Sequence, residues 1–121
     1  MRHTTSELEA LWRGAMLRAL TKLGVAEREF FEPNKDTYVQ HSRACICRVL
    51  AGMTIDGQHA SLTRLSNMIG YKRSTSAVKH LCRWVDCRVQ KNDEDVIKML
   101  EDIRAAIHGK PVVSQAKTEA A

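Results

Sequence analysis

The sequence has few residues that interrupt helices and no long apolar run. Of its 121 residues only two are proline and six are glycine, and aromatic residues make up 5%. Because proline and glycine disfavour helix interiors, their scarcity favours a helical fold over a strand-rich one. No run approaches the ~18 consecutive apolar residues of a membrane-spanning helix. Residues 1–7 lead directly into a charged amphipathic segment, unlike a secretory signal. We therefore expect a cytoplasmic protein with no membrane partner.

The residues that build catalytic or metal centres are scarce or badly placed. Cys45 and Cys47 lie two apart inside a predicted helix, so they point to different faces, and Cys82 and Cys87 also fall within a predicted helix. Zinc ribbons and fingers hold such pairs in loops instead. No H-E-x-x-H motif occurs, and no nucleophile–base pair can be proposed from spacing. We expect no enzyme, catalytic residue, metal, cofactor or small-molecule substrate, with Cys47 and Cys82 as small buried hydrophobes.

The N-terminal segment has the pattern of an amphipathic helix. Ser6 and Glu9 form a capping-box motif, and Gly24 has the position of a helix-ending glycine. Apolar residues recur between them at steps of three and four, which gives a continuous apolar stripe. This stripe can pack on the rest of the chain or on a second copy. Its candidate homodimer contacts are Leu8, Leu11, Trp12, Ala15, Ala19 and Leu23.

The rest of the chain divides into three parts by composition and periodicity. We expect a connector over 25–40 with one helical turn before Pro33, a helical domain over 41–108, and a disordered tail over 109–121. Within the domain, periodicity predicts helices over 41–52, 61–69, 74–88 and 93–107. Asp56 and Gly57 indicate a turn after the first of these. Trp84 is expected to pack against the last. The predicted class is all-α.

Positive charge is concentrated in the middle of the sequence. The whole chain carries a formal charge of +5, but residues 41–91 hold nine Lys or Arg against two Asp, a net charge of +7. The N-terminal 40 residues are neutral and the remainder is acidic. A basic centre of this kind is typical of proteins that bind a polyanion such as nucleic acid. A solvated basic face without a partner is the alternative.

Residues 61–88 have the arrangement of a helix-turn-helix. Two short predicted helices are joined by a turn that contains Gly70, and the second begins with small polar residues. Short side chains let a helix tip approach the major groove, while long donors reach phosphates and guanine edges. Arg73 is the candidate base contact. The full set of candidate DNA-binding residues is Arg64, Lys72, Arg73, Ser74, Thr75, Ser76, Lys79, His80 and Arg83.

Residues 43–107 resemble a known DNA-binding domain. The matching positions of the second helix are Arg73, Val78, His80, Cys82, Arg83 and Val85. In this pattern the segment is similar to the C-terminal DNA-binding domain of the bacterial DnaA replication initiators, which is related to the Trp repressor fold. The resemblance implies a Trp repressor/DnaA-like helix-turn-helix, preceded here by the long N-terminal helix.

The sequence departs from that family where bases are read. The family has Asp-His-Thr-Thr where this chain has Ser74, Thr75, Ser76 and Ala77. Only Arg73, and the Ser76 hydroxyl in place of a threonine, carry over as base contacts. No G-x-x-x-x-G-K-[ST] motif occurs, so we expect no nucleotide-binding motor domain of that family's kind. The resemblance thus implies a related domain with a different DNA target.

Three functional hypotheses follow from these features. The first is a sequence-specific double-stranded DNA-binding protein, a transcriptional regulator of a bacterium or phage. Because a single recognition helix makes few base contacts, this hypothesis favours a dimer or binding to tandem sites. The second is a protein-interaction adaptor or anti-activator that kept the fold and lost DNA recognition. The third is a nucleoid-type binder without sequence preference.

Overall fold

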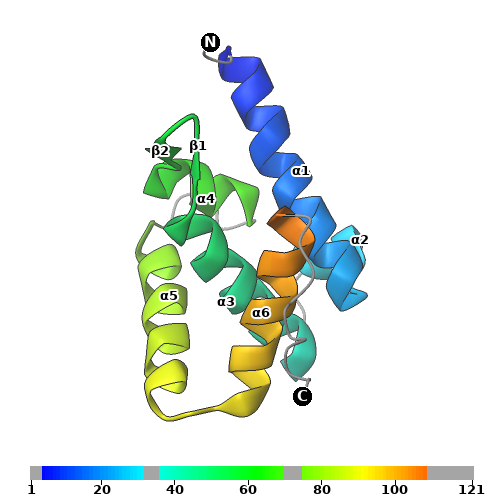
Figure 1. The fold of residues 1–121 in the computed structure, drawn as a ribbon, viewed down its shortest axis with the longest axis vertical. Helices are drawn as coiled ribbons and strands as arrows, with labels where there is room; N and C mark the ends of the chain where they lie inside the picture. Colours follow the sequence, from blue (N-terminus) through cyan, green and yellow to red (C-terminus); the bar gives the residue numbers. More distant parts are fainter. Residues whose placement is uncertain (1–3, 32–35, 70–74, 109–121) are drawn as a thin grey trace, which may run out of the picture.

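The computed structural model describes residues 4–31, 36–69 and 75–108 (Figure 1). Within these ranges the chain is mostly helical, as predicted, with six helices and one small hairpin. The elements are α1 (Thr5–Leu23), α2 (Glu27–Phe31), α3 (Thr37–Gly52), β1 (Thr54–Ile55), β2 (Gln58–His59), α4 (Leu62–Met68), α5 (Thr75–Gln90) and α6 (Glu94–His108). None of the described helices is long and apolar enough to span a membrane.

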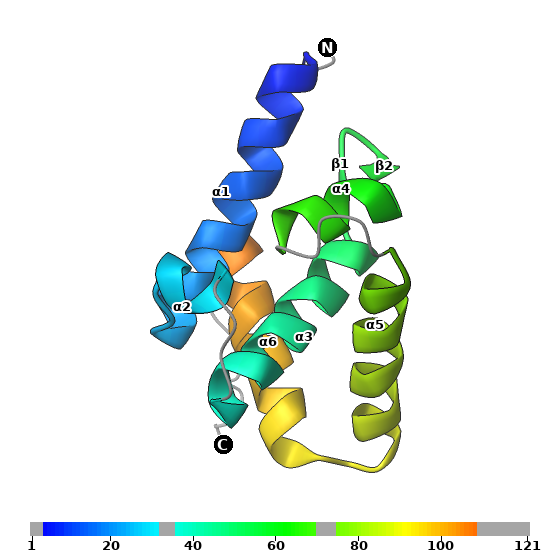
Figure 2. The ribbon, with the colours of Figure 1, turned by 180° about the vertical axis from the view of Figure 1, so that it is seen from behind.

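Helix α3 lies in the middle of the molecule, with α5 on one side and α1 and α6 on the other (Figures 1 and 2). Every side chain from Ser42 to Cys47 is buried, which is the pattern of a helix covered on all sides. The helix predicted over 41–52 is confirmed but begins earlier, at Thr37. The reason is Asp36, whose carboxylate accepts hydrogen bonds from the backbone amides of Tyr38 and Val39.

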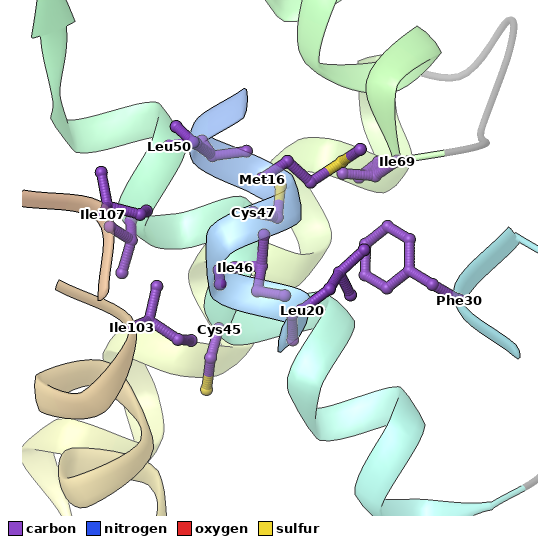
Figure 3. Packing of buried hydrophobic residues seen from close by; sticks show 14 of the residues in the cluster. Met16, Leu20, Phe30, Cys45, Ile46, Cys47, Leu50, Ile69, Ile103 and Ile107 are labelled. Carbon is purple, nitrogen blue, oxygen red and sulfur yellow. The ribbon is translucent and has the colours of Figure 1, made fainter. Parts of the chain in front are cut away.

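The core forms where α1, α3 and α6 meet (Figure 3). Each helix contributes a stripe of fully or almost fully buried side chains, among them Met16, Leu20, Ile46, Leu50, Ile103 and Ile107. Phe30 from α2 closes one side of the cluster. Arg18 also joins α1 to α6, because its guanidinium donates a hydrogen bond to the Ile107 carbonyl at 3.0 Å. The positive charge of Arg18 interacts favourably with the partial negative charge at the C-terminal end of α6.

The stripe of α1 is largely used inside the chain. Trp12, Ala15 and Ala19 are buried, and the main contacts of α1 are with α6 and α3. These three predicted homodimer contacts are therefore not free to meet a second copy. Leu8 and Leu23 are half-buried, and Leu11 is 40% exposed. The homodimer itself stays a prediction, with Leu11 as its exposed member.

The ends of α1 and the hairpin show how local sequence sets the turns. The predicted cap at Ser6 is wrong: Thr4 caps the helix, and its capping box is completed by Glu7. Gly24 has φ 73°, as predicted for a helix-ending glycine. Asp56 and Gly57 have φ 55° and 74°, so the predicted turn is the tight reversal that joins β1 to β2.

We predict that Thr4→Ala lowers the free energy of unfolding by about 1 kcal/mol, because a capping side chain is lost. Ser6→Ala is the matched control. Ser6 is exposed in the first turn of α1, where alanine is the better helix former, so this change should not destabilise the protein. Urea unfolding followed by circular dichroism measures both. Equal destabilisation by the two variants would contradict Thr4 as the cap.

Candidate nucleic-acid interface

Helices α4 and α5 follow one another in the sequence and pack together. The predicted cap of α4 is confirmed, because the Ser61 hydroxyl accepts a hydrogen bond from the backbone amide of Arg64 at 3.0 Å. Leu65 and Ile69 are buried in the core. These contacts hold α4 between the core and the N-terminal half of α5.

Helix α5 forms one edge of the molecule, on the side away from α2 (Figures 1 and 2). Val78 and Val85 are fully buried, and the other two members of the predicted stripe, Leu81 and Cys82, are half-buried. The side of α5 opposite this stripe faces solvent along its whole length.

The structure brings four of the nine predicted DNA-binding residues together on that outer side. Ser76, Lys79, His80 and Arg83 are exposed, and their spacing of three and four places them on one helix face. Thr75 is half-buried at the beginning of α5. Three further candidates, Lys72, Arg73 and Ser74, lie outside the described residues.

Arg64 lies on α4 and not on this face of α5. It is half-buried and borders a hollow of about 450 Å³ between α1 and α4, together with Glu9 and Arg13.

Two cations of the basic stretch have structural roles. Arg43 is only 8% exposed; its guanidinium donates a hydrogen bond to the Phe30 carbonyl and lies 5.4 Å from the centroid of the Phe30 ring. Arg48 on α3 places Nε 2.7 Å from Oδ1 of Asp86 on α5. The pair of Arg48 and Asp86 is already neutral in the charge of +7 counted over residues 41–91, but the burial of Arg43 lowers the charge available to a polyanion.

Trp84 lies elsewhere than predicted. Instead of the final helix, its ring contacts His41 of α3, with 4.8 Å between the ring centroids. The guanidinium carbon of Arg88 lies 5.2 Å from the indole centroid. Periodicity indicates only that Trp84 borders the buried stripe of α5; it does not indicate which neighbour covers it.

Two hollows border Trp84. The larger, about 360 Å³, lies on the outer side of α5 and is lined by His80, Arg83, Trp84, Cys87, Arg88 and Lys91. The smaller, about 190 Å³, lies between α3 and α5 and is lined by Gln40, His41, Ala44, His80, Leu81 and Trp84. Arg88 and Lys91 are not among the site residues predicted from the sequence. The sequence feature that could have identified them is the four-residue spacing from Trp84 to Arg88 and from Cys87 to Lys91, which is the spacing of neighbours on one helix face.

The cysteines lie in and beside the core as free thiols. Cys45 and Cys47 are both buried although they point to different sides of α3, because α3 is covered all round. Burial raises the pKa of Cys45 to about 12. A hydrogen bond with Cys82, together with burial, raises the pKa of Cys47. The same hydrogen bond, helped by the charge of Arg48, lowers the pKa of Cys82 to about 7. Among the described residues, no group of three His, Cys, Asp or Glu is placed to hold a metal ion.

Comparison with known proteins adds no relative: no protein-family model, curated protein or solved structure matches the chain. Its function must therefore be inferred from α5 and the residues around it.

We predict that Arg43→Leu lowers the free energy of unfolding by about 2 kcal/mol, because the buried carbonyl of Phe30 loses a charged donor. Arg83→Leu, at an exposed position on α5, should change it by no more than about 0.5 kcal/mol. Chemical denaturation of both variants tests this. If Arg43→Leu left the free energy of unfolding unchanged, Arg43 would have no structural role and would count among the exposed cations.

We also predict the order in which the thiols react with iodoacetamide at neutral pH. Exposed Cys87 and half-buried Cys82 should be labelled in the folded protein, since an accessible thiolate is the reactive species. Cys45 and Cys47 should be labelled only after unfolding. Peptide mass spectrometry identifies each site, and labelling of Cys45 at the rate of Cys87 in the folded protein would refute the buried position of α3.

Proposed function

We propose that the protein binds double-stranded DNA with α4 and α5 as a helix-turn-helix and α5 in the major groove. One observation supports this most directly. Val78 and Val85 fix one side of α5 in the core, while Ser76, Lys79 and Arg83 are exposed on the other. A recognition helix needs an inner side that is firmly held and a basic outer side. The side chains at the beginning of that outer side must be short.

The side chains of α5 suit the two kinds of contact that such a helix makes. Thr75 and Ser76 are short, so the beginning of the helix can come close to the base edges. Lys79 and Arg83 are long donors one and two turns further on, and they suit phosphates. His80 can donate to a phosphate.

Arg73 remains the proposed base contact, flanked by Lys72 and Ser74. These three rest on the sequence pattern and on the resemblance to the DnaA-type domain. Because this chain has different residues where that family reads bases, we infer a DNA target unlike that family's. We propose a transcriptional regulator of a bacterium or phage, which acts in the cytoplasm as a dimer or on tandem sites.

Selection of bound sequences from a random duplex pool is the central test. We expect a recurring sequence motif, and an affinity for the selected duplex that falls steeply as salt is raised, because bound phosphates release counterions. Binding without a motif would favour the nucleoid-type hypothesis. No binding to any duplex at low salt would refute DNA binding and favour the adaptor hypothesis.

Single variants assign the roles on the selected duplex. Arg73→Ala should cost about 1–3 kcal/mol, concentrated at one base position, whereas Lys79→Ala and Arg83→Ala should weaken all sequences alike and reduce the salt dependence. Lys98→Ala on α6 is the control, since that side chain is 76% exposed on another helix. Fluorescence anisotropy measures the affinities. An equal loss on every sequence for Arg73→Ala would make Arg73 a phosphate contact.

A further inference from the structure

We propose that the C-terminal half of α5 is a docking surface for an acidic amphipathic segment of a partner protein. The surface is centred on Trp84 and comprises the two hollows that border its ring. We call it the Trp84 surface. It adjoins the proposed DNA contacts in the N-terminal half of α5 and shares His80 and Arg83 with them.

The charge of the Trp84 surface favours an anionic partner. Arg83, Arg88 and Lys91 line the larger hollow, and none of the described residues that line it is acidic. The one carboxylate within α5, that of Asp86, is bound by Arg48. Arg88 lies 3.6 Å from a carboxylate oxygen of Asp93, but both side chains are partly exposed. Such a pair contributes little, so Arg88 can exchange this partner for another carboxylate.

The shape of the surface favours apolar side chains as well. Trp84 is half-buried between hollows of about 360 and 190 Å³, and even a cavity of about 150 Å³ accepts a benzene ring. Tryptophan and arginine are the residues most enriched at the energetic centres of protein interfaces. A partner with leucine or phenylalanine on one face and carboxylates beside it satisfies both features.

The contacts of Trp84 favour a peptide over a nucleic acid base. Single-stranded nucleic acids bind by stacking bases on the open faces of aromatic rings. The indole instead has the His41 ring 4.8 Å away and the Arg88 guanidinium 5.2 Å away. His41 borders the smaller hollow and Arg88 the larger one. A stacked base would compete with these neighbours for the indole, whereas apolar side chains can enter the hollows beside the ring.

The Trp84 surface and the proposed DNA contacts overlap at one end. His80 and Arg83 are proposed DNA contacts and also line the larger hollow. Trp84 lies eight residues after Ser76, a rise of about 12 Å along the helix. A duplex on the first turns of α5 therefore takes up one end of the surface, and we expect it to compete with the peptide for Arg83.

The test uses a fluorescein-labelled 16-residue helical peptide with glutamates on one face and leucine and phenylalanine on the other. Anisotropy measures its binding to the full chain, and ¹⁵N–¹H spectra locate it. We expect shifted amides over residues 80–91 and around His41, together with the Trp84 indole N–H. Two matched peptides, with Glu→Gln or with Leu and Phe→Ser, should each bind about tenfold more weakly, a change of about 1.4 kcal/mol.

Paired charge reversals separate this surface from general electrostatics. Arg88→Glu with Lys91→Glu should weaken the acidic peptide about tenfold or more. Lys98→Glu with Arg104→Glu makes the same change in net charge on exposed positions of α6 that line neither hollow and should weaken it less than about twofold, because exposed charges outside the contact are screened. Circular dichroism checks that each remains folded.

Three outcomes would overturn the proposal. The peptide could fail to bind up to millimolar concentration, the Glu→Gln peptide could bind as well as the acidic one, or a single-stranded oligonucleotide could shift the same amides and outcompete the peptide. If the protein binds the peptide at the Trp84 surface but binds no duplex DNA, the proposed function is refuted and the docking proposal stands.

Discussion

Helix α3 is covered by α1 and α6 on one side and by α5 on the other, and from Ser42 to Cys47 its side chains are buried. In such a position each polar group needs a partner inside the protein. The Ser42 hydroxyl donates to the Tyr38 carbonyl, and the Arg43 guanidinium donates to the Phe30 carbonyl. The charge of Arg43 therefore belongs to the core, whereas Lys79, Arg83 and Arg88 on α5 are exposed and can meet a partner.

The same helix fixes the orientation of α5 about its own axis. Two contacts hold α5 to α3 on opposite flanks: Arg48 with Asp86 on one, and His41 with Trp84 on the other. Between them, Val78 and Val85 are buried against the core. The buried inner side and the two flank contacts favour one orientation of α5, in which Ser76, Lys79 and Arg83 face outward. A single orientation suits the proposed role of matching the base edges of one DNA sequence.

Sequence periodicity was sufficient for the number, type and inner faces of the long helices, because burial recurs every three or four residues whatever the partner. It could not choose between Thr4 and Ser6 as the first cap, since each is followed three residues later by a glutamate. Sequence periodicity also could not predict contacts between segments that lie far apart in the chain. Nothing local indicates that Trp84 meets His41, or that Arg43 reaches back to Phe30 and so leaves the surface. Four candidate DNA contacts were placed together on α5, but Lys72, Arg73 and Ser74 depend on the sequence alone.

The two proposed partners of α5 are both anionic, and the surfaces proposed for them share His80 and Arg83. A guanidinium that binds a phosphate of the duplex is not available to a carboxylate of the peptide at the same time. The two ligands also repel each other, weakly at physiological ionic strength, where the screening length is about 8 Å, and more strongly at low salt. Duplex and peptide should therefore compete, and the competition should strengthen as salt is removed.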